Sequence, residues 1–150
     1  MTAMDDPRYD ALLLDNQLCF PLYACAREIV KRYKPHLDPL GLTYTQYIAM
    51  MVLWESKQIT SKALGDRLLL DSGTLTPVLK KLEEKGFITR SRDPQDERNL
   101  RVTLTPEGES LRERAAEIPP NMARGFPLSP EDARTLYTLL HRFLDACREG

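Results

Sequence analysis

Two short amphipathic segments that follow each other almost without a break constrain this chain more than any other feature. Thr60 can cap the first segment, which runs through Leu69, and Asp71 or Ser72 can cap the second, which ends before Gly86. The second segment places its apolar residues three, four and seven positions apart, which is the spacing of one helix face. Two short helices joined by such a tight turn form a helix-turn-helix.

A β-hairpin is predicted directly after this helix pair. Phe87–Ser91 and Leu100–Leu104 alternate in polarity and contain β-branched residues, and the sequence RDPQDERN separates them. Since this connection is polar, charged and contains proline, we expect a long exposed hairpin, or wing. The alternative interpretation is a solvated charged hairpin on some other α+β domain.

Two helices are predicted before this unit. Asn16–Tyr33 has a helical apolar pattern, and Pro35 is expected to end it. Thr43 or Thr45 can cap the next helix, whose residues are mostly apolar. A helix of that kind is buried on nearly all sides.

Two more helices are predicted after the hairpin. One should start after Thr105 and end at the proline pair 119–120, and the last should start after Ser129. These helices and the first one carry apolar faces that a helix-turn-helix with a wing does not need. Pairing of two copies about a two-fold axis would bury those faces, whereas packing of the three helices within one chain is the alternative. We expect a homodimer of chains that are mainly α with a small β-hairpin (α+β).

The composition fits one globular domain over residues 1–150. The chain is 42% hydrophobic and 29% charged, with a formal net charge of −1. Within this domain we expect a winged helix-turn-helix, DNA-binding lobe at 45–105. Residues 8–40 and 106–150 would supply the dimerisation helices.

Several classes of protein are not expected. No run approaches the roughly 20 apolar residues of a membrane span, and the N-terminus is polar, so we expect a cytoplasmic protein without membrane contact. His36, His141 and the three cysteines lack the paired spacing of zinc ligands. The sequence shows no nucleophile elbow and no glycine-rich phosphate loop. We therefore expect no metal, no cofactor and no enzymatic activity.

The helix that begins near residue 72 has the character of a recognition helix. Its N-terminal end carries small or polar residues, which is where such a helix meets base edges and phosphates. Residues 72–103 contain seven basic and five acidic residues, a small excess in a chain of net charge −1. Arg98 is near the tip of the wing, which can enter a narrow minor groove where negative potential is enhanced. Asp96, two residues earlier, could brace that arginine.

Asp96-Glu97-Arg98 and the following VTLTPEG, after a helix that reads SGTLTPVLKKLEEKGFI, resemble the winged helix-turn-helix regulators of the MarR family. The resemblance covers nearly the whole chain and implies a homodimer that binds a pseudopalindromic operator in double-stranded DNA. It places one recognition helix in each half-site and makes Arg98 the minor-groove residue, with Asp96 as its support. The further groove or phosphate contacts that it implies are Ser72, Thr74, Thr76, Pro77 and Lys80. Arg90, a basic residue of the hairpin, is a further candidate for DNA binding.

The stretch from LDNQLCFPLYACAREIV to MMVLWE is similar to one branch of that family, the organic hydroperoxide resistance regulators. Cys19 matches the reactive cysteine of the branch, and Tyr23, Tyr33 and Tyr44 match as well. The resemblance implies that the last two tyrosines hydrogen-bond the cysteine sulfur from across the dimer interface.

The chemistry of Cys19 agrees with such a role. Pro21 is tolerated only in the first turn of a helix, which places Cys19 at the helix start. Helix N-termini and phenolic hydroxyls stabilise thiolates, and a thiolate is the nucleophile toward a peroxide. Phe20, Leu22 and Trp54 would be apolar neighbours suited to an organic peroxide. Position alone leaves a buried, inert cysteine as the alternative.

The other two cysteines have different expected roles. Cys25 is six helical steps, or about 240° net, away from Cys19, so the two cannot join within one helix, and Cys25 is expected to be a packing residue. One group of the branch has a resolving cysteine between its last two helices, where this chain reads NMARGFPLS. We therefore expect oxidised Cys19 to join a small cellular thiol or to over-oxidise, with Cys147 as the alternative partner.

The resemblance implies a complete regulatory cycle. The reduced dimer binds its operator and represses, and an organic hydroperoxide oxidises Cys19, which changes the spacing of the recognition helices and releases the DNA. One alternative is a MarR-type repressor that a small phenolic or lipophilic ligand releases. A more distant alternative is a thiol peroxidase in which Cys19 turns over.

Overall fold

The computed structural model describes residues 6–149, without the side chains of residues 96 and 97. It divides into two compact units, with the boundary after Ile118. The helices before the hairpin are α1 (Pro7–Asp10), the 3₁₀ turn η2 (Leu14–Asn16), α2 (Cys19–Leu37), the 3₁₀ turn η3 (Asp38–Leu40), α3 (Tyr44–Ser56), α4 (Ser61–Leu68) and α5 (Ser72–Glu84). The strands are β1 (Gln58–Thr60), β2 (Ile88–Asp93) and β3 (Asp96–Leu104). The helices after the hairpin are α6 (Pro106–Ala115), α7 (Ile118–Ala123) and α8 (Pro130–Glu149).

The helix-turn-helix predicted from the sequence is confirmed. The Thr60 hydroxyl accepts the N–H of Ala63 at 3.1 Å and starts α4, and the Asp71 carboxylate accepts the N–H of Thr74 at 2.7 Å and starts α5. At Gly65 the turn between the two helices is tight, because a Cβ there would lie 2.8 Å from a backbone oxygen. Only glycine allows the turn after α4 to approach the helix this closely.

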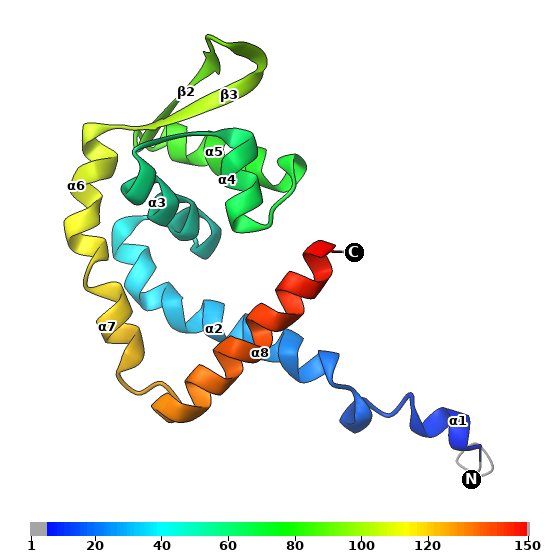
Figure 1. Ribbon diagram of the computed structural model, residues 1–150. Coiled ribbons are helices and arrows are strands. Elements are labelled where there is room, and N and C mark those ends of the chain that lie inside the picture. The colour runs from blue at the N-terminus through cyan, green and yellow to red at the C-terminus, as the bar shows by residue number, and fades with distance from the viewer. Residues whose placement is uncertain (1–5, 150) are drawn as a thin grey trace. The chain divides into compact units, whose positions relative to one another are not determined.

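The wing is the β-hairpin of β2 and β3 (Figure 1). It belongs to a three-stranded antiparallel sheet of order β1-β3-β2. Its strands are longer than predicted, since pairing continues to Asp93 and Asp96 and leaves Pro94 and Gln95 as the turn. The predicted hairpin is therefore confirmed, but the eight-residue connection expected between its strands is too long. Strand β1 was not predicted. It is three residues long, and it forms because it pairs with a segment more than forty residues later in the chain.

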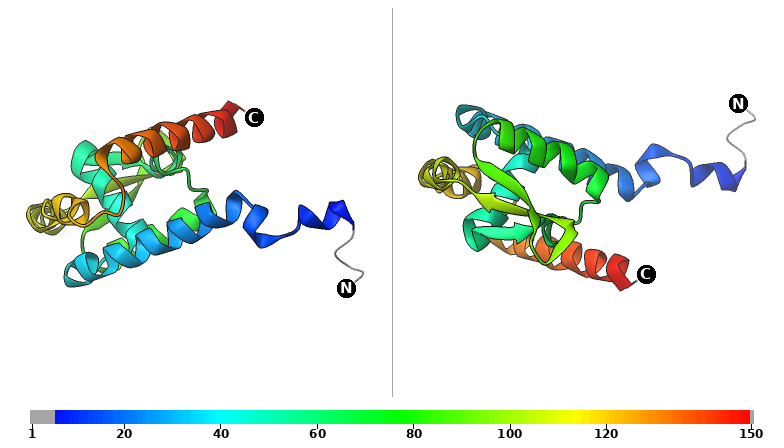
Figure 2. Two further views of the ribbon diagram at one scale, coloured as in Figure 1. Left: turned by 90° about the horizontal axis from the view of Figure 1, so that it is seen from below. Right: turned by 90° about the horizontal axis from the view of Figure 1, so that it is seen from above.

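Two predicted helix boundaries near prolines are also wrong. The helix predicted at Asn16–Tyr33 starts at Cys19 and continues to Leu37, with Pro35 inside it. Proline near the end of a helix removes a single N–H bond, and the C-cap N–H of Asp38 still reaches the Lys34 carbonyl. In Figure 2, α2 is one continuous helix.

The proline pair 119–120 begins a helix instead of ending one. Helix α6 stops at Ala115, and the prolines lie in the first turn of α7. The first N–H groups of a helix have no partner within it, so prolines cost little at that position.

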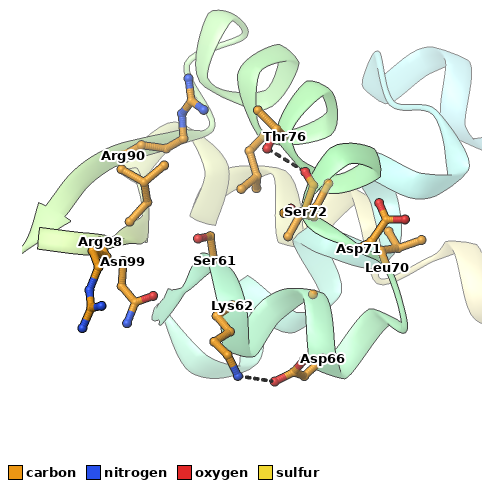
Figure 3. Close-up of a pocket in the computed structure, with 14 residues that line it drawn as sticks. Ser61, Lys62, Asp66, Leu70, Asp71, Ser72, Thr76, Arg90, Arg98 and Asn99 are labelled. Carbon is orange, nitrogen blue, oxygen red and sulfur yellow. Dashed lines mark hydrogen bonds and ion pairs between the residues drawn. The ribbon is translucent and has the colours of Figure 1, made fainter. Parts of the chain in front are cut away.

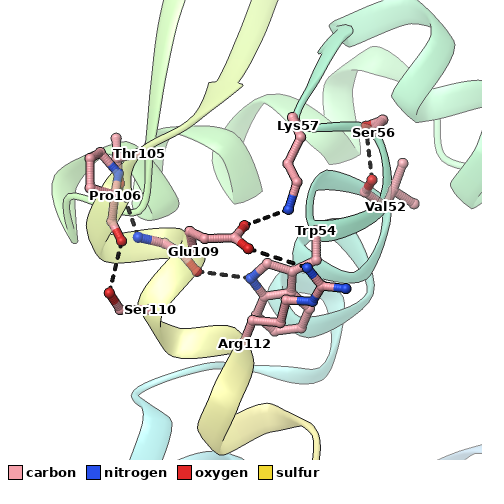
Figure 4. A network of polar contacts seen from close by, with 10 residues as sticks. Val52, Trp54, Ser56, Lys57, Thr105, Pro106, Glu109, Ser110 and Arg112 are labelled. Atoms are coloured by element: carbon pink, nitrogen blue, oxygen red, sulfur yellow. Dashed lines mark hydrogen bonds and ion pairs between the residues drawn. The ribbon is translucent and has the colours of Figure 1, made fainter.

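The core of the first unit surrounds α3, which the sequence correctly predicted as buried. Met50 and Leu53 of α3 are completely buried, as are Leu64 of α4 and Leu82 of α5. The Trp54 indole N–H donates to the carbonyl of Gly108 at 2.8 Å and joins the end of α3 to α6 (Figure 4). Trp54 is thus a core residue of the winged unit, and its suggested place as an apolar neighbour of Cys19 stays a prediction.

Ion pairs at the surface close the same junction between α3 and α6. The ammonium of Lys57 lies 2.7 Å from the carboxylate of Glu109, and Arg112 lies 3.2 Å from that carboxylate on its other side (Figure 4). Both cations contribute to holding the pKa of Glu109 below its ordinary value, mainly through the hydrogen bond from Lys57. The ion pair between Lys57 and Glu109 and the Trp54 hydrogen bond therefore hold the end of α3 against α6 at the base of the wing.

Helices α2 and α8 each expose a long apolar face. In the first unit the N-terminal part of α2 runs away from α3 (Figure 1), and only Leu37 of this helix is buried. In the second unit α8 buries none of its twenty residues. The large apolar side chains exposed on these two helices are Phe20, Leu22, Tyr23, Val30, Leu136, Tyr137, Leu139, Leu140, Phe143 and Leu144. Among residues 6–149, no helix has the length and apolar character needed to cross a bilayer.

Candidate nucleic-acid interface and thiol site

The start of α5 presents hydroxyl groups and a cation to solvent. The carboxylate of Asp71 caps the helix, and the N–H of Thr74 that it accepts lowers its pKa. The hydroxyl of Thr76 donates to the carbonyl of Ser72 at 2.7 Å, so its oxygen keeps lone pairs for another donor. The predicted groove residues Ser72, Thr74, Thr76, Pro77 and Lys80 are all exposed on this helix.

A pocket of about 320 Å³ separates this helix start from the wing (Figure 3). Ser61 and Lys62 of α4 line one side, and Arg98 and Asn99 of β3 line another. Lys62 is paired with Asp66 one turn later at 3.7 Å. The pocket is thus a concave surface between a helix N-terminus and a hairpin, lined by both polar and apolar side chains.

Arg90 connects the wing to the recognition helix. Its guanidinium lies 3.1 Å from the carboxylate of Glu83 on α5, and its backbone N–H donates to the same carboxylate at 3.0 Å. These bonds lower the pKa of Glu83, with the side-chain bond as the largest cause. The guanidinium groups of Arg90 and Arg98 point away from each other (Figure 3). Arg90 is therefore engaged within the chain, and its predicted contact with DNA stays a prediction.

The wing tip carries Arg98 on its exposed part, as predicted. The predicted support from the side chain of Asp96 lies outside the described residues. Sequence reasoning missed a different acidic residue, Asp93, which is nearly buried and pairs with Arg101 at 3.2 Å. A usable signal existed, because a lone aspartate just before a Pro-containing turn commonly accepts backbone N–H groups.

Cys19 is the first residue of α2, as the position of Pro21 predicted, and its side chain is exposed. The alternative of a buried cysteine is therefore wrong for the single chain. Tyr23 is four residues later, on the same face of the helix, and its ring contacts the guanidinium of Arg27 at 5.7 Å. Cys25 is also exposed, so a packing role for it would need a partner chain.

Three tyrosines form a cluster where α2 meets α3. The ring centroids of Tyr33 and Tyr44 are 4.9 Å apart, and Tyr47, which sequence reasoning missed, is 5.7 Å from Tyr33. Burial raises the pKa of Tyr33 and of Tyr44, and it raises the pKa of Tyr47 to about 12. The phenols therefore remain protonated and can donate hydrogen bonds at any physiological pH.

The structure does not bring Cys19 and this cluster together within one chain. Tyr33 is fourteen residues after Cys19 on the same helix, which corresponds to about 21 Å along the axis at 1.5 Å per residue. A hydrogen bond spans about 3 Å. Only the cluster of a second copy could therefore reach the sulfur of Cys19.

The chain is similar to known regulators along nearly its whole length. Residues 42–100 match the MarR family. The chain is 45% identical to the organic hydroperoxide resistance transcriptional regulator of Bacillus subtilis, over 95% of this chain and 97% of the relative. The chain belongs to the MarR family. It is also 41% identical to the HTH-type transcriptional regulator SarZ of Staphylococcus epidermidis, over 87% of this chain and 88% of that protein.

Solved structures agree with this assignment to the MarR family. Reduced AbfR bound to DNA aligns with a TM-score of 0.77 at 33% identity, over 93% of this chain and 98% of that chain. AbfR of Staphylococcus epidermidis aligns with a TM-score of 0.73 at 33% identity, over 97% and 100%. The predicted family and fold class are confirmed. MarR-family relatives are transcriptional regulators, so this chain is a regulator and not an enzyme, and the thiol peroxidase alternative is set aside.

Proposed function

We propose that this MarR-family chain is a homodimeric repressor that binds operator DNA while Cys19 is reduced and releases it when an organic hydroperoxide oxidises Cys19. One observation carries the proposal. Cys19 is exposed at a helix start, and the tyrosine cluster of its own chain is too far away to contact it. Two copies could complete each other's thiol sites, which would make dimer geometry sensitive to the state of the sulfur.

The proposed dimer uses the apolar faces of α2 and α8, which a single chain leaves exposed. Isologous pairing would cover the same faces of both copies. In this arrangement residues 1–150 act as one domain with a DNA-binding lobe at 45–105 and dimerisation helices at 8–40 and 106–150. The regulator would work in the cytoplasm, where bacterial DNA lies.

The proposed DNA contact has two parts. The start of α5, with Ser72, Thr74, Thr76, Pro77 and Lys80, would enter the major groove of each half-site. Arg98 of the wing, supported by Asp96, would enter the adjacent minor groove, and Arg90 would lie near a phosphate. Reduced and overoxidized AbfR have both been solved bound to DNA, which supports DNA as the partner of this fold.

The proposed chemistry begins with the thiolate of Cys19. The sulfur attacks the terminal oxygen of the hydroperoxide, the O–O bond breaks, and the alkoxide leaves as an alcohol after it takes a proton. The resulting sulfenic acid then condenses with a small cellular thiol, which forms a mixed disulfide and releases water. Tyr23 and the partner copy's tyrosine cluster would donate hydrogen bonds to the thiolate, and the added bulk of the oxidised sulfur would displace them.

The test compares three cysteine variants on a duplex that the wild-type protein selects from a random-sequence pool. After about one equivalent of cumene hydroperoxide and a small thiol, we expect the wild type to lose the duplex and to gain a mass adduct at Cys19. Cys19→Ser should bind the duplex and keep it after oxidation. The matched controls Cys25→Ser and Cys147→Ser should behave like the wild type, whereas normal release by Cys19→Ser would remove this cysteine from the mechanism.

A further inference from the structure

The pairing of β2 with β3 changes register near the tip of the wing. The two strands pair without a break as far as Arg92 and Leu100, but the next pair is Asp93 with Asp96. Three residues of β3 therefore have no counterpart on β2 and form a bulge. The middle residue of this bulge is Arg98. Whatever holds the bulge decides in which direction Arg98 leaves the hairpin.

Asp93 holds the two sides of this bulge together. One of its carboxylate oxygens accepts the N–H of Gln95 in the turn at 3.0 Å and lies 3.2 Å from the guanidinium of Arg101 on β3. Arg101 faces Ser91, and Asp93 is two residues beyond Ser91, so the two charged side chains share one face of the sheet. The Asp93 side chain is only 12% exposed, which strengthens a charge-assisted hydrogen bond.

Arg101 belongs to the fixed base of the hairpin. It pairs with Ser91 of β2 on one side and with Thr60 of β1 on the other, so β3 is the central strand at this point. Thr60 in turn caps α4. From Arg101 toward the tip, the described sheet has only two strands. The ion pair between Asp93 and Arg101 therefore connects the two-stranded tip to the helix-turn-helix.

We infer that Asp93 and Arg101 are positioning residues for the DNA contact of the wing. Their ion pair closes the bulge and sets the direction in which Arg98 is presented. The inference rests on the proposed function, in which Arg98 enters the minor groove, and it requires neither residue of the pair to touch DNA.

The role of Asp93 can be separated from simple electrostatics by the sign of its effect. Replacing a carboxylate beside DNA with an uncharged group strengthens attraction to phosphates, so charge alone predicts tighter binding by Asp93→Asn. Loss of the ion pair with Arg101 predicts weaker binding of the DNA sequence that the wild type prefers, because Arg98 is no longer held in place. The asparagine keeps the size of the side chain and the oxygen that accepts the N–H of Gln95.

The experiment uses full-length protein, the duplex selected by the wild type, and a scrambled duplex of the same composition. We expect Asp93→Asn to bind the selected duplex about tenfold more weakly, the scale of one lost groove contact, and to bind the scrambled duplex as tightly as before or more tightly. Glu109→Gln is the matched control, because it also replaces a carboxylate that pairs with an arginine at 3.2 Å, outside the wing. Glu109→Gln should prefer the selected duplex over the scrambled duplex as strongly as the wild type does.

A double-mutant cycle shows whether Asp93 acts through Arg98. In an Arg98→Ala background, Asp93→Asn should lower the affinity for the selected duplex less than about twofold, because the arginine that Asp93 positions is gone. A general loss of structure would lower affinity equally in both backgrounds. If circular dichroism shows that Asp93→Asn is unfolded, Arg101→Lys, which keeps the charge and loses the planar fork, makes the same comparison.

Two results would overturn the inference. One is that Asp93→Asn binds the selected duplex as tightly as the wild type, and the other is an equal loss with and without Arg98. Failure of the proposed function looks different, since the wild-type protein would then select no sequence from the pool.

Discussion

The separation of Cys19 from the tyrosine cluster predicts that the thiol site can be restored between two defective chains. One chain carries Cys19→Ser with its tyrosines intact, and the other carries Tyr33→Phe and Tyr44→Phe with its cysteine intact. Neither homodimer has a complete site. In the heterodimer, the tyrosines of the first chain meet the cysteine of the second.

The size of the effect follows from the structure. About 21 Å along α2 separates Cys19 from Tyr33, which excludes a contact within the chain. Two hydrogen bonds to a charged sulfur, at about 1.5 kcal/mol each or more, correspond to a factor on the order of 100 in the rate of reaction with peroxide. Random exchange of subunits gives about half heterodimers, so about half of the Cys19-bearing chains should regain the fast rate.

The assay is trapping of the sulfenic acid under limiting cumene hydroperoxide, with tags of different mass to confirm heterodimers. Tyr9→Phe is the matched control, since Tyr9 is an exposed tyrosine outside the cluster, and it should react like the wild type. If heterodimers form and no fast phase returns, or if the double phenylalanine homodimer reacts at the wild-type rate, the partner chain's tyrosines do not serve Cys19.

Three further predictions concern the winged unit. Arg98→Ala should weaken binding of the selected duplex at least tenfold and lower the salt slope by about one in an anisotropy titration, and unchanged affinity would refute the wing contact. Gly65→Ala forces a Cβ against a backbone oxygen at 2.8 Å and should cost about 1–3 kcal/mol in urea unfolding, whereas the control Gly73→Ala, with nothing nearer than 3.5 Å, should not destabilise the fold. The hydrogen bond from Arg90 lowers the pKa of Glu83 in the folded state. The stabilisation that this bond gives the fold is therefore present above the unfolded-state pKa of about 4.3, and it is lost as the pH falls through the folded-state pKa. The melting temperature of Glu83→Gln should therefore fall less steeply below about pH 4 than that of the wild type.

Local chemistry made most of the helix starts predictable from the sequence. The hydroxyl or carboxylate groups of Thr43, Thr60, Asp71, Thr105 and Ser129 each accept an N–H three residues later in the structure. A cap of this kind is decided by residues within one turn, so the sequence contains all the information it needs. The order of helices and hairpin followed from the same signals, whereas the family followed from the resemblance of the hairpin and of the helix before it to MarR-family sequences.

Candidate site residues were predictable where their role depends on position along the chain. Pro21 placed Cys19 at a helix start, and turn chemistry placed Arg98 near the wing tip. The ion-pair partners of Arg90 and Asp93 were not predictable, because Glu83 is seven residues from Arg90 on helix α5 and Arg101 is eight residues from Asp93 on the other strand of the hairpin. A register with a bulge is set by the pairing of two strands and leaves no local signature.

The sequence by itself determined the helix caps, the helix-turn-helix and the position of the cysteine at the start of α2, because each depends on neighbours within one or two turns. Only the tertiary structure decided that β1 pairs with β3, that α2 runs past Pro35, and that the tyrosines of α2 and α3 gather far from Cys19. These features depend on which distant surfaces pack together, and that choice is made by the burial of the whole core and not by any short stretch of residues.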